Sequence, residues 1–140
     1  MYILDTDHLT ILQRGGQLAQ QLKYKLADLD PNQVFTTIIT YEEQTRGWLS
    51  YIAKQSSIDS QIIAYQELEK HLNNYRSIPV IGYDQNSALK FQELRKIYKK
   101  LGSMDLKIAS ICITHQALLL TRNLKDFGQI EELNTEDWTI

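Results

Sequence analysis

The chain has 140 residues, a formal net charge of -2 at pH 7, and 43% hydrophobic and 23% charged residues. With only 2 prolines and 6 glycines, this composition excludes intrinsic disorder and fibrous repeats. The longest apolar runs, such as 117–120, are far shorter than the roughly 20 residues that cross a bilayer, and no signal-peptide pattern opens the chain. We therefore expect a single domain over residues 1–140, with no membrane partner.

The single cysteine, Cys112, bears on both compartment and metal chemistry. One cysteine can form neither an intramolecular disulfide nor a cysteine-rich zinc site, so the sequence favours the cytoplasm and excludes thiolate metal ligands. The slightly acidic charge balance argues against broad adhesion to nucleic acid. A local basic patch can still guide a phosphate chain to a small acidic site.

Short apolar runs alternate along the chain with longer segments of helical spacing. The runs that predict strands are 1–5, 34–39, 79–81 and 117–121. The segments with apolar residues at helical spacing are 18–29, 58–75, 89–101 and 104–115. The last of these helices is expected to bury Ile108, Ile111 and Cys112. Strands that alternate with helices predict an α/β fold with a parallel sheet covered by helices.

Carboxylate and amide side chains lie at or after the ends of the predicted strands, except that one of them, Asp105, opens the helix before the last predicted strand. They are Asp5, Asp7, Glu43, Asp105, Asn123 and Asp126. In open parallel sheets, ligands collect at the carboxyl ends of the strands, so these side chains are expected to converge at one edge. Carboxylates held close together raise one another's pKa, and a hard cation such as Mg²⁺ or Mn²⁺ offsets that repulsion while activating a water.

Two of these acids also fit helix-capping patterns. The segment 40–43, Thr-Tyr-Glu-Glu, matches a capping box in which Thr40 caps a helix and Glu43 reaches back to the cap amide. Ser103 is positioned to cap a helix whose first turn contains Asp105, where the helix dipole favours negative charge. Capping alone therefore explains both acids as well as a metal site does.

The remaining acids differ in how well a structural role explains them. Asp7 can cap a helix that starts at His8, and Asp126 can end a turn. Asp5 resists such an explanation, because a carboxylate at the end of a buried strand carries a desolvation cost that requires a partner. Asp5 is therefore the strongest single indication of chemistry.

Other features of the sequence are less informative. His8, His71 and His115 have no spacing that makes a metal pair and are expected to pack or to lie at the surface. The lysine-rich run 96–100 is typical of a solvated helix end that can also meet a polyanion. Four basic residues lie near the acids and are candidates for phosphate contact: Arg46, Lys107, Arg122 and Lys125.

Four motifs occur in a fixed order along the chain. They are Leu-Asp-Thr-Asp at 4–7, Ile-Thr-Tyr-Glu-Glu at 39–43 with Gly47, Gly-Ser-Met-Asp at 102–105 with Ile108 and Ala109, and Leu-Thr-Arg-Asn-Leu-Lys-Asp-Phe at 120–127. Together they resemble the motifs of the PIN domain and, more narrowly, of the VapC-type toxins of bacterial toxin–antitoxin pairs. The likeness continues to 136–138 and covers nearly the whole chain.

This resemblance implies a PIN fold and an endoribonuclease that uses Mg²⁺ or Mn²⁺. It also implies inhibition by a VapB-like antitoxin, pairing as a homodimer, and an RNA substrate for which transfer RNA is one candidate. Asp5, Glu43 and Asp105 match the family's three principal metal-site acids. Many relatives have an aspartate where this chain has Asn123, while Asp126 belongs to an Asp-Phe pair, so either residue can complete the site.

We therefore expect Asp5, Glu43, Asp105 and Asp126 to be the catalytic acids. The first three are expected to hold the metal ion and activate water. Supporting roles, in orienting the acids or contacting phosphate, fall to Thr6, Asp7, Thr121, Arg122 and Asn123.

Two other functions compete with this interpretation. Asp5-Thr6-Asp7 after an apolar strand mimics the nucleophile and the acid/base aspartate of haloacid-dehalogenase-like phosphatases. Leu9 stands where that family has threonine or valine, and the chain is short for that fold. A non-catalytic binding module, whose acids are only caps, predicts no divalent-metal binding and tolerance of Asp5→Asn.

Overall fold

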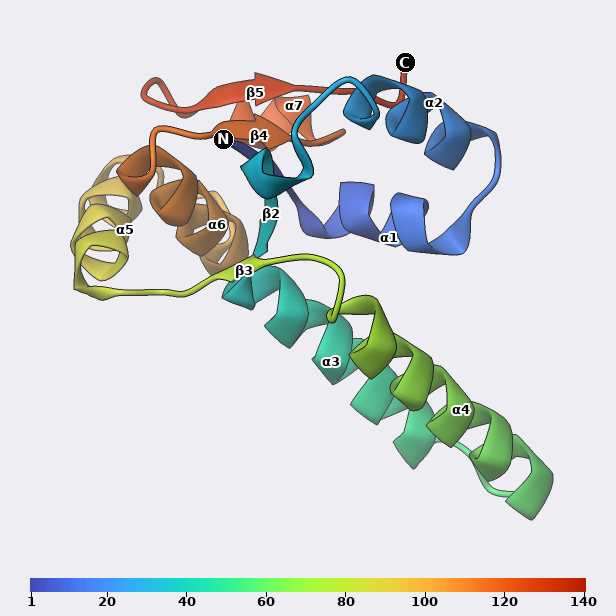
Figure 1. Ribbon diagram of the computed structural model, residues 1–140. Helices are drawn as coiled ribbons and strands as arrows, with labels where there is room; N and C mark the ends of the chain where they lie inside the picture. The colour runs from blue at the N-terminus through green and yellow to red at the C-terminus, as the bar shows by residue number, and fades with distance from the viewer.

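A parallel sheet flanked by helices forms the centre of the molecule in a computed structural model that describes all 140 residues (Figure 1). The strands are β1 Tyr2–Leu4, β2 Val34–Thr37, β3 Val80–Ile81, β4 Leu118–Leu120 and β5 Asn134–Glu136. Their order is β3-β2-β1-β4-β5, and every neighbouring pair is parallel. The predicted α/β class is confirmed.

The helices cover both faces of this sheet. They are α1 Thr6–Arg14, α2 Gln17–Leu26, α3 Ile38–Ala53, α4 Ile58–Asn74, α5 Gln85–Ile97, α6 Ser103–Thr114 and α7 Leu124–Phe127, with a 3₁₀ turn at Pro31–Gln33. In Figure 1, α5 and α6 lie on one side of the sheet and α1 and α2 on the other, while α3 and α4 project outward as a helical hairpin. None of the helices is long and apolar enough to cross a membrane.

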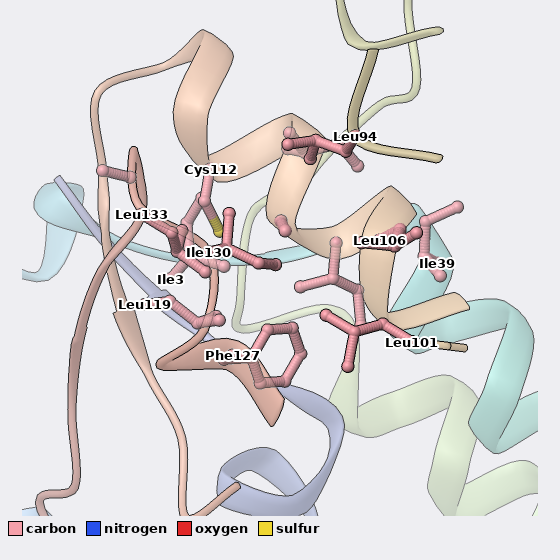
Figure 2. Packing of buried hydrophobic residues seen from close by; sticks show 14 residues of the cluster. Ile3, Ile39, Leu94, Leu101, Leu106, Cys112, Leu119, Phe127, Ile130 and Leu133 are labelled. Atoms are coloured by element: carbon pink, nitrogen blue, oxygen red, sulfur yellow. The ribbon is translucent and has the colours of Figure 1, made fainter. Parts of the chain in front are cut away.

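Alternate residues of the strands supply two separate hydrophobic clusters, because successive side chains point to opposite faces. Ile3 and Leu119 pack with Ile111 and Phe127 in the larger cluster, which Figure 2 shows against helix α6. Leu4 and its neighbour Leu120 pack on the other face with Leu9 and Leu22 from α1 and α2. Burial of each such side chain is worth about 1.5–3 kcal/mol, so the central strands are fixed from both sides.

Several predicted boundaries were wrong because buried side chains cap the helices earlier than expected. The predicted strand 34–39 ends at Thr37, whose hydroxyl accepts a hydrogen bond from Thr40 N–H at 3.1 Å and caps α3. The proposed capping box with Thr40 as the cap is therefore wrong. Asp5 rather than Asp7 caps α1, and Gly102 rather than Ser103 is the residue that precedes α6.

Helical spacing located α2, α4, α5 and α6 but not α1, α3 and α7, and it did not predict how far each helix is buried. The predicted helices 18–29 and 89–101 end earlier, at Leu26 and Ile97. The apolar stripe on α4 is mostly exposed, with Ile58 at 76% and Tyr65 at 59%. Since α4 packs mainly on α3 at the outside of the molecule (Figure 1), these apolar side chains stay exposed.

Candidate active site

Asp5 is the first residue after β1, the central strand of the sheet. The chain leaves β1 toward β2 on one side, while β4 pairs on the other side. Such a switch point, at the carboxyl ends of parallel strands, is where α/β proteins bind ligands. Asp5 is only 4% exposed, and its Oδ1 accepts a hydrogen bond from His8 N–H at 2.7 Å.

The environment of Asp5 favours its protonated form. Burial is the largest cause and raises its pKa to about 6, and the charges of Asp7 and Asp105 add to the increase. The hydrogen bonds from His8 N–H and the Thr121 hydroxyl act in the opposite direction but do not cancel it. Asp5 caps α1, but its burial and the neighbouring negative charges disfavour the ionised carboxylate. A bound cation would favour the ionised form.

Glu43 reaches the same place from α3. Its Oε1 accepts a hydrogen bond from the Thr6 hydroxyl at 2.8 Å, and Thr6 Oγ1 also lies 3.1 Å from Thr40 Oγ1. The Thr6 hydroxyl has one proton, which it donates to the Glu43 carboxylate. Thr6 Oγ1 is therefore the acceptor in its contact with the Thr40 hydroxyl. Thr6 thereby orients Glu43 toward the start of α1, as its predicted supporting role requires.

Asp105 enters from the first turn of α6. Burial raises its pKa, and the charges of Glu43 and Asp126 raise it further. A cavity of about 140 Å³ brings the acids together; it is lined by Asp5, Thr6, Asp7, Glu43, Asp105, Ile108, Asn123 and Phe127. The structure thus brings the three predicted metal-site acids to a single cavity, although 38 and 62 positions separate them in sequence.

Asn123 and Asp126 have different positions relative to this cavity. Asn123 lines it, and its backbone N–H donates to Thr121 Oγ1 at 2.9 Å. The Asn123 side chain caps α7, and its Nδ2 donates to Asp126 Oδ2 at 3.2 Å. Asp126 does not line the cavity, but its charge acts on Asp105. Asn123 therefore forms part of the cavity wall and is hydrogen-bonded to Asp126, which lies outside the cavity.

Of the four predicted phosphate-contact residues, Arg122 is the one paired with an acid of the cavity. Its Nε lies 3.8 Å from Asp7 Oδ2, and both side chains are about half exposed. Arg46 instead pairs with Glu42, one turn earlier on α3. Lys107 Nζ lies 5.7 Å from the centre of the Phe91 ring. A phosphate at the cavity mouth would compete with Asp7 for Arg122.

His8, for which we expected a packing or surface position, is a neighbour of the site. It is fully buried, and its Nε2 accepts a hydrogen bond from Trp138 N–H at 3.2 Å. Burial lowers its pKa, so the ring is neutral and carries its proton on Nδ1, which has no hydrogen-bond partner and lies 3.7 Å from Asp5 Oδ1. His8 thus connects the C-terminal segment to Asp5.

The three acids are chemically suited to a hard divalent cation, although their side chains are not yet close enough together to surround one. No three His, Cys, Asp or Glu side chains are close enough to form a ready ion cage. Asp5, Glu43 and Asp105 nevertheless offer only oxygen ligands, which Mg²⁺ and Mn²⁺ prefer, and Mg²⁺ is commonly held by one or two carboxylates and several waters. Burial, and to a lesser extent the neighbouring carboxylates, raises the pKa of Asp5 and of Asp105, and a bound cation would offset both effects.

The sequence of this chain matches a known family over almost its whole length. The sequence model of the PIN domain matches residues 2–133. The chain belongs to the PIN domain family. Membership in this family excludes the haloacid-dehalogenase-like alternative.

Individual PIN domain proteins align over almost the whole chain. Ribonuclease VapC1 of Haemophilus influenzae strain R2866 is 26% identical over 144 residues, with 99% of this chain and 98% of the relative covered. The structure of VapBC-1 from nontypeable Haemophilus influenzae superposes with a TM-score of 0.74 at 25% identity, covering 99% and 98% of the two chains. The structure of FitAcB from Neisseria gonorrhoeae superposes with a TM-score of 0.75 at 18% identity, again covering 99% and 98% of the two chains. At this identity the similarity is one of fold alone.

Proposed function

We propose that this PIN domain, as a single unit over residues 1–140, is an endoribonuclease that requires Mg²⁺ or Mn²⁺. The observation that carries the proposal is the cavity shared by Asp5, Glu43 and Asp105 at the switch point of the sheet. The similarity to a protein named Ribonuclease VapC1 supports RNA as the substrate, with transfer RNA as one candidate.

Each catalytic residue has a defined task in this proposal. Asp5, Glu43 and Asp105 would hold the ion, which would supply an activated water and positive charge for the phosphodiester transition state. Thr6 keeps Glu43 oriented through its 2.8 Å hydrogen bond. Asn123 holds Asp126 close enough to add negative charge beside Asp105.

The phosphate is held by groups around the carboxylates. Arg122 leaves Asp7 to contact a phosphate oxygen, because a guanidinium bonds phosphate strongly and its pairing with the exposed Asp7 is weak. Thr121 is buried and acts on Asp5 and on the Asn123 backbone, so it positions the acids without touching RNA.

We further propose that the chain is the toxin of a VapBC-type pair, inhibited by a VapB-like antitoxin, and that it acts in the cytoplasm as a homodimer. The similarity to VapBC-1 from nontypeable Haemophilus influenzae supports the antitoxin partner. The exposed apolar residues of α4, which include Ile58, Ile62 and Tyr65, provide unpartnered surface of the kind that protein partners cover.

Incubation of the purified protein with a mixed pool of transfer and ribosomal RNA tests the activity. The reactions contain Mg²⁺, Mn²⁺ or EDTA, and the variants are Asp5→Asn and, as a matched control at an exposed acid, Asp28→Asn. We expect cleavage with a divalent ion, none in EDTA, and loss of cleavage in Asp5→Asn alone. Absence of cleavage by the folded wild type with either ion, together with equal metal binding by Asp5→Asn, would favour a binding module.

A further inference from the structure

A second, larger cavity of about 750 Å³ lies next to the carboxylates, between α1, α3 and α4. Thr6 and Glu43 line both cavities, so the larger one, here called the α1–α3–α4 groove, begins at the proposed catalytic acids. Only two of its 13 lining residues are hydrophobic, Trp48 and Tyr51. The groove is therefore a polar site with one aromatic wall.

Two cations of the groove have no acidic partner. Arg14 at the end of α1 and Lys70 on α4 are both exposed, and neither forms an ion pair. His71 also lines the groove, but burial lowers its pKa and its Nε2 is bonded to Thr45 Oγ1 at 2.8 Å. Free cations beside a carboxylate site match an anionic chain that extends past the acids, as the phosphates of RNA do.

The aromatic wall is not explained by packing in the core. Trp48 is half-buried and belongs to neither hydrophobic cluster. Tyr51, one turn later on α3, meets it at 72° with the ring centres 5.9 Å apart, and this edge-to-face contact fixes the indole. A held aromatic ring at the side of a polar groove suits stacking with a nucleobase, because every base has a π-face.

Polar groups between the cations and the aromatic wall are held in place before any ligand binds. Gln44 Nε2 donates to Thr10 Oγ1 at 3.0 Å and to Gln13 Oε1 at 3.1 Å, while its Oε1 accepts from the Tyr75 hydroxyl at 2.7 Å. Gln13 Nε2 is buried without a partner. Glu67 is a further acceptor on the wall. These bonds use both Nε2 protons and the oxygen of Gln44, so the groups left to meet a base edge are Gln13 Nε2 as a donor and Glu67 as an acceptor.

We propose that the α1–α3–α4 groove binds an unpaired nucleotide next to the scissile phosphate of RNA, with the base stacked on Trp48 and the adjoining phosphates bound by Arg14 and Lys70. This inference rests on the proposed ribonuclease function and deepens it. Since a base inside a duplex is already stacked on its neighbours, the groove selects single-stranded loops or ends.

RNA binding without catalysis tests the groove directly. The probe is a short single-stranded RNA oligonucleotide in EDTA, with the same strand annealed to its complement for comparison. A Trp138→Phe protein has Trp48 as its sole tryptophan, because the chain has two, so base stacking is read as quenching of Trp48 fluorescence. We expect quenching by the single strand, weak quenching by the duplex, and a dissociation constant about tenfold to a hundredfold higher in Trp48→Ala.

Matched variants separate stacking from phosphate contact. Trp48→Phe should retain much of the affinity, and Tyr24→Ala, which removes an exposed aromatic ring outside the groove, should retain all of it. Lys70→Gln and Arg14→Gln should each reduce the slope of log affinity against log salt by about 0.7, the value for one phosphate contact on a single strand. Lys54→Gln, at an exposed lysine outside the groove, should leave the slope unchanged.

The outcomes distinguish this inference from the function on which it rests. Cleavage of RNA by Trp48→Ala with unchanged KM, affinity and cut sites would overturn the groove and leave the ribonuclease intact. Quenching of Trp48 by RNA without cleavage under any metal condition would support the groove and overturn the ribonuclease. Unchanged RNA binding by Trp48→Ala, with weakened binding of an antitoxin peptide, would show that the groove is a peptide site and overturn the proposal.

Discussion

The Thr6 hydroxyl donates to Glu43 Oε1 at 2.8 Å, which joins the first residue of α1 to a carboxylate of α3. Because Thr6 directly follows Asp5, this one bond sets the position of Glu43 relative to Asp5. Both acids depend on the same turn of the chain. A hydroxyl that is not itself a proposed metal ligand therefore helps to hold two proposed metal ligands in their relative positions.

Replacement of this hydroxyl should reduce activity more than stability. Thr6→Val keeps the shape and removes the donor, so we expect RNA cleavage and Mg²⁺ affinity to fall about 10- to 100-fold, as is typical for groups that orient metal ligands. The free energy of unfolding should fall by about 1 kcal/mol. Steady-state cleavage against Mg²⁺ concentration and urea unfolding measure the two effects. Thr6→Ser, which keeps the donor, should remain close to wild type.

Asp5→Asn should stabilise the metal-free protein at neutral pH. Asn keeps the oxygen that accepts from His8 N–H and is as good a helix cap as Asp, while it removes a buried charge. The pKa of Asp5 is raised from 3.8 to about 6, so the folded state holds its proton more tightly than the unfolded state. Wild-type stability should therefore decrease as the pH rises through that window, by about 1 to 3 kcal/mol in total.

Urea unfolding in EDTA between about pH 3.5 and pH 8 measures this difference. The advantage of Asp5→Asn should be near zero at the acid end and constant above about pH 7. Saturating Mg²⁺ should then favour the wild type, because an ion stabilises the folded state that binds it. A variant that is less stable than wild type at pH 7 in EDTA would show that the Asp5 charge has a protein partner.

Asn123→Asp tests which residue completes the metal site. Asn123 lines the cavity, whereas Asp126 does not, so a carboxylate at position 123 would be added directly beside Asp105. The substitution also removes the Asn123 Nδ2 group that donates a hydrogen bond to Asp126. We expect lower stability in EDTA and a larger increase in melting temperature on addition of Mn²⁺ than in wild type. An equal increase in both proteins would mean that position 123 does not contact the ion.

Much of the fold was predictable because its signals are local. The apolar runs that became β1 and β4 are buried on both faces, and their burial requires no knowledge of distant residues. Strand β5 was not predicted, because its three residues, Asn134–Glu136, are polar and become a strand only through pairing with β4. The same holds for the α1–α3–α4 groove, which exists only where three helices meet.

The candidate site was predictable as a set of acids but not in its geometry. The segment 40–43 fits a capping box and a metal-site motif equally well in sequence. In the structure the buried hydroxyl of Thr37 caps α3. Glu43 is therefore not part of a capping box and accepts a hydrogen bond from Thr6 instead. The contact of His8 with the C-terminal segment could not be predicted, because its hydrogen-bond partner Trp138 lies 130 positions away.

His8 should destabilise the protein as the solution becomes acidic, opposite to Asp5. Burial lowers its pKa below 6.5, so the unfolded state binds the proton more readily than the folded state. Stability should therefore fall as the pH drops through about 6.5. His8→Gln keeps an acceptor for Trp138 N–H but does not titrate, so it should lose less stability than wild type between about pH 7 and pH 5.

His8→Leu tests the hydrogen bond that holds the C-terminal segment. It leaves the Trp138 N–H without its acceptor at 3.2 Å, so the free energy of unfolding should fall by about 1 to 3 kcal/mol. Hydrogen exchange at the Trp138 amide should accelerate in His8→Leu but not in His8→Gln. His115→Gln, at an exposed histidine, controls for the substitution itself. Equal protection of the amide in His8→Leu and wild type would show that strand β5 fixes the C-terminal segment without His8.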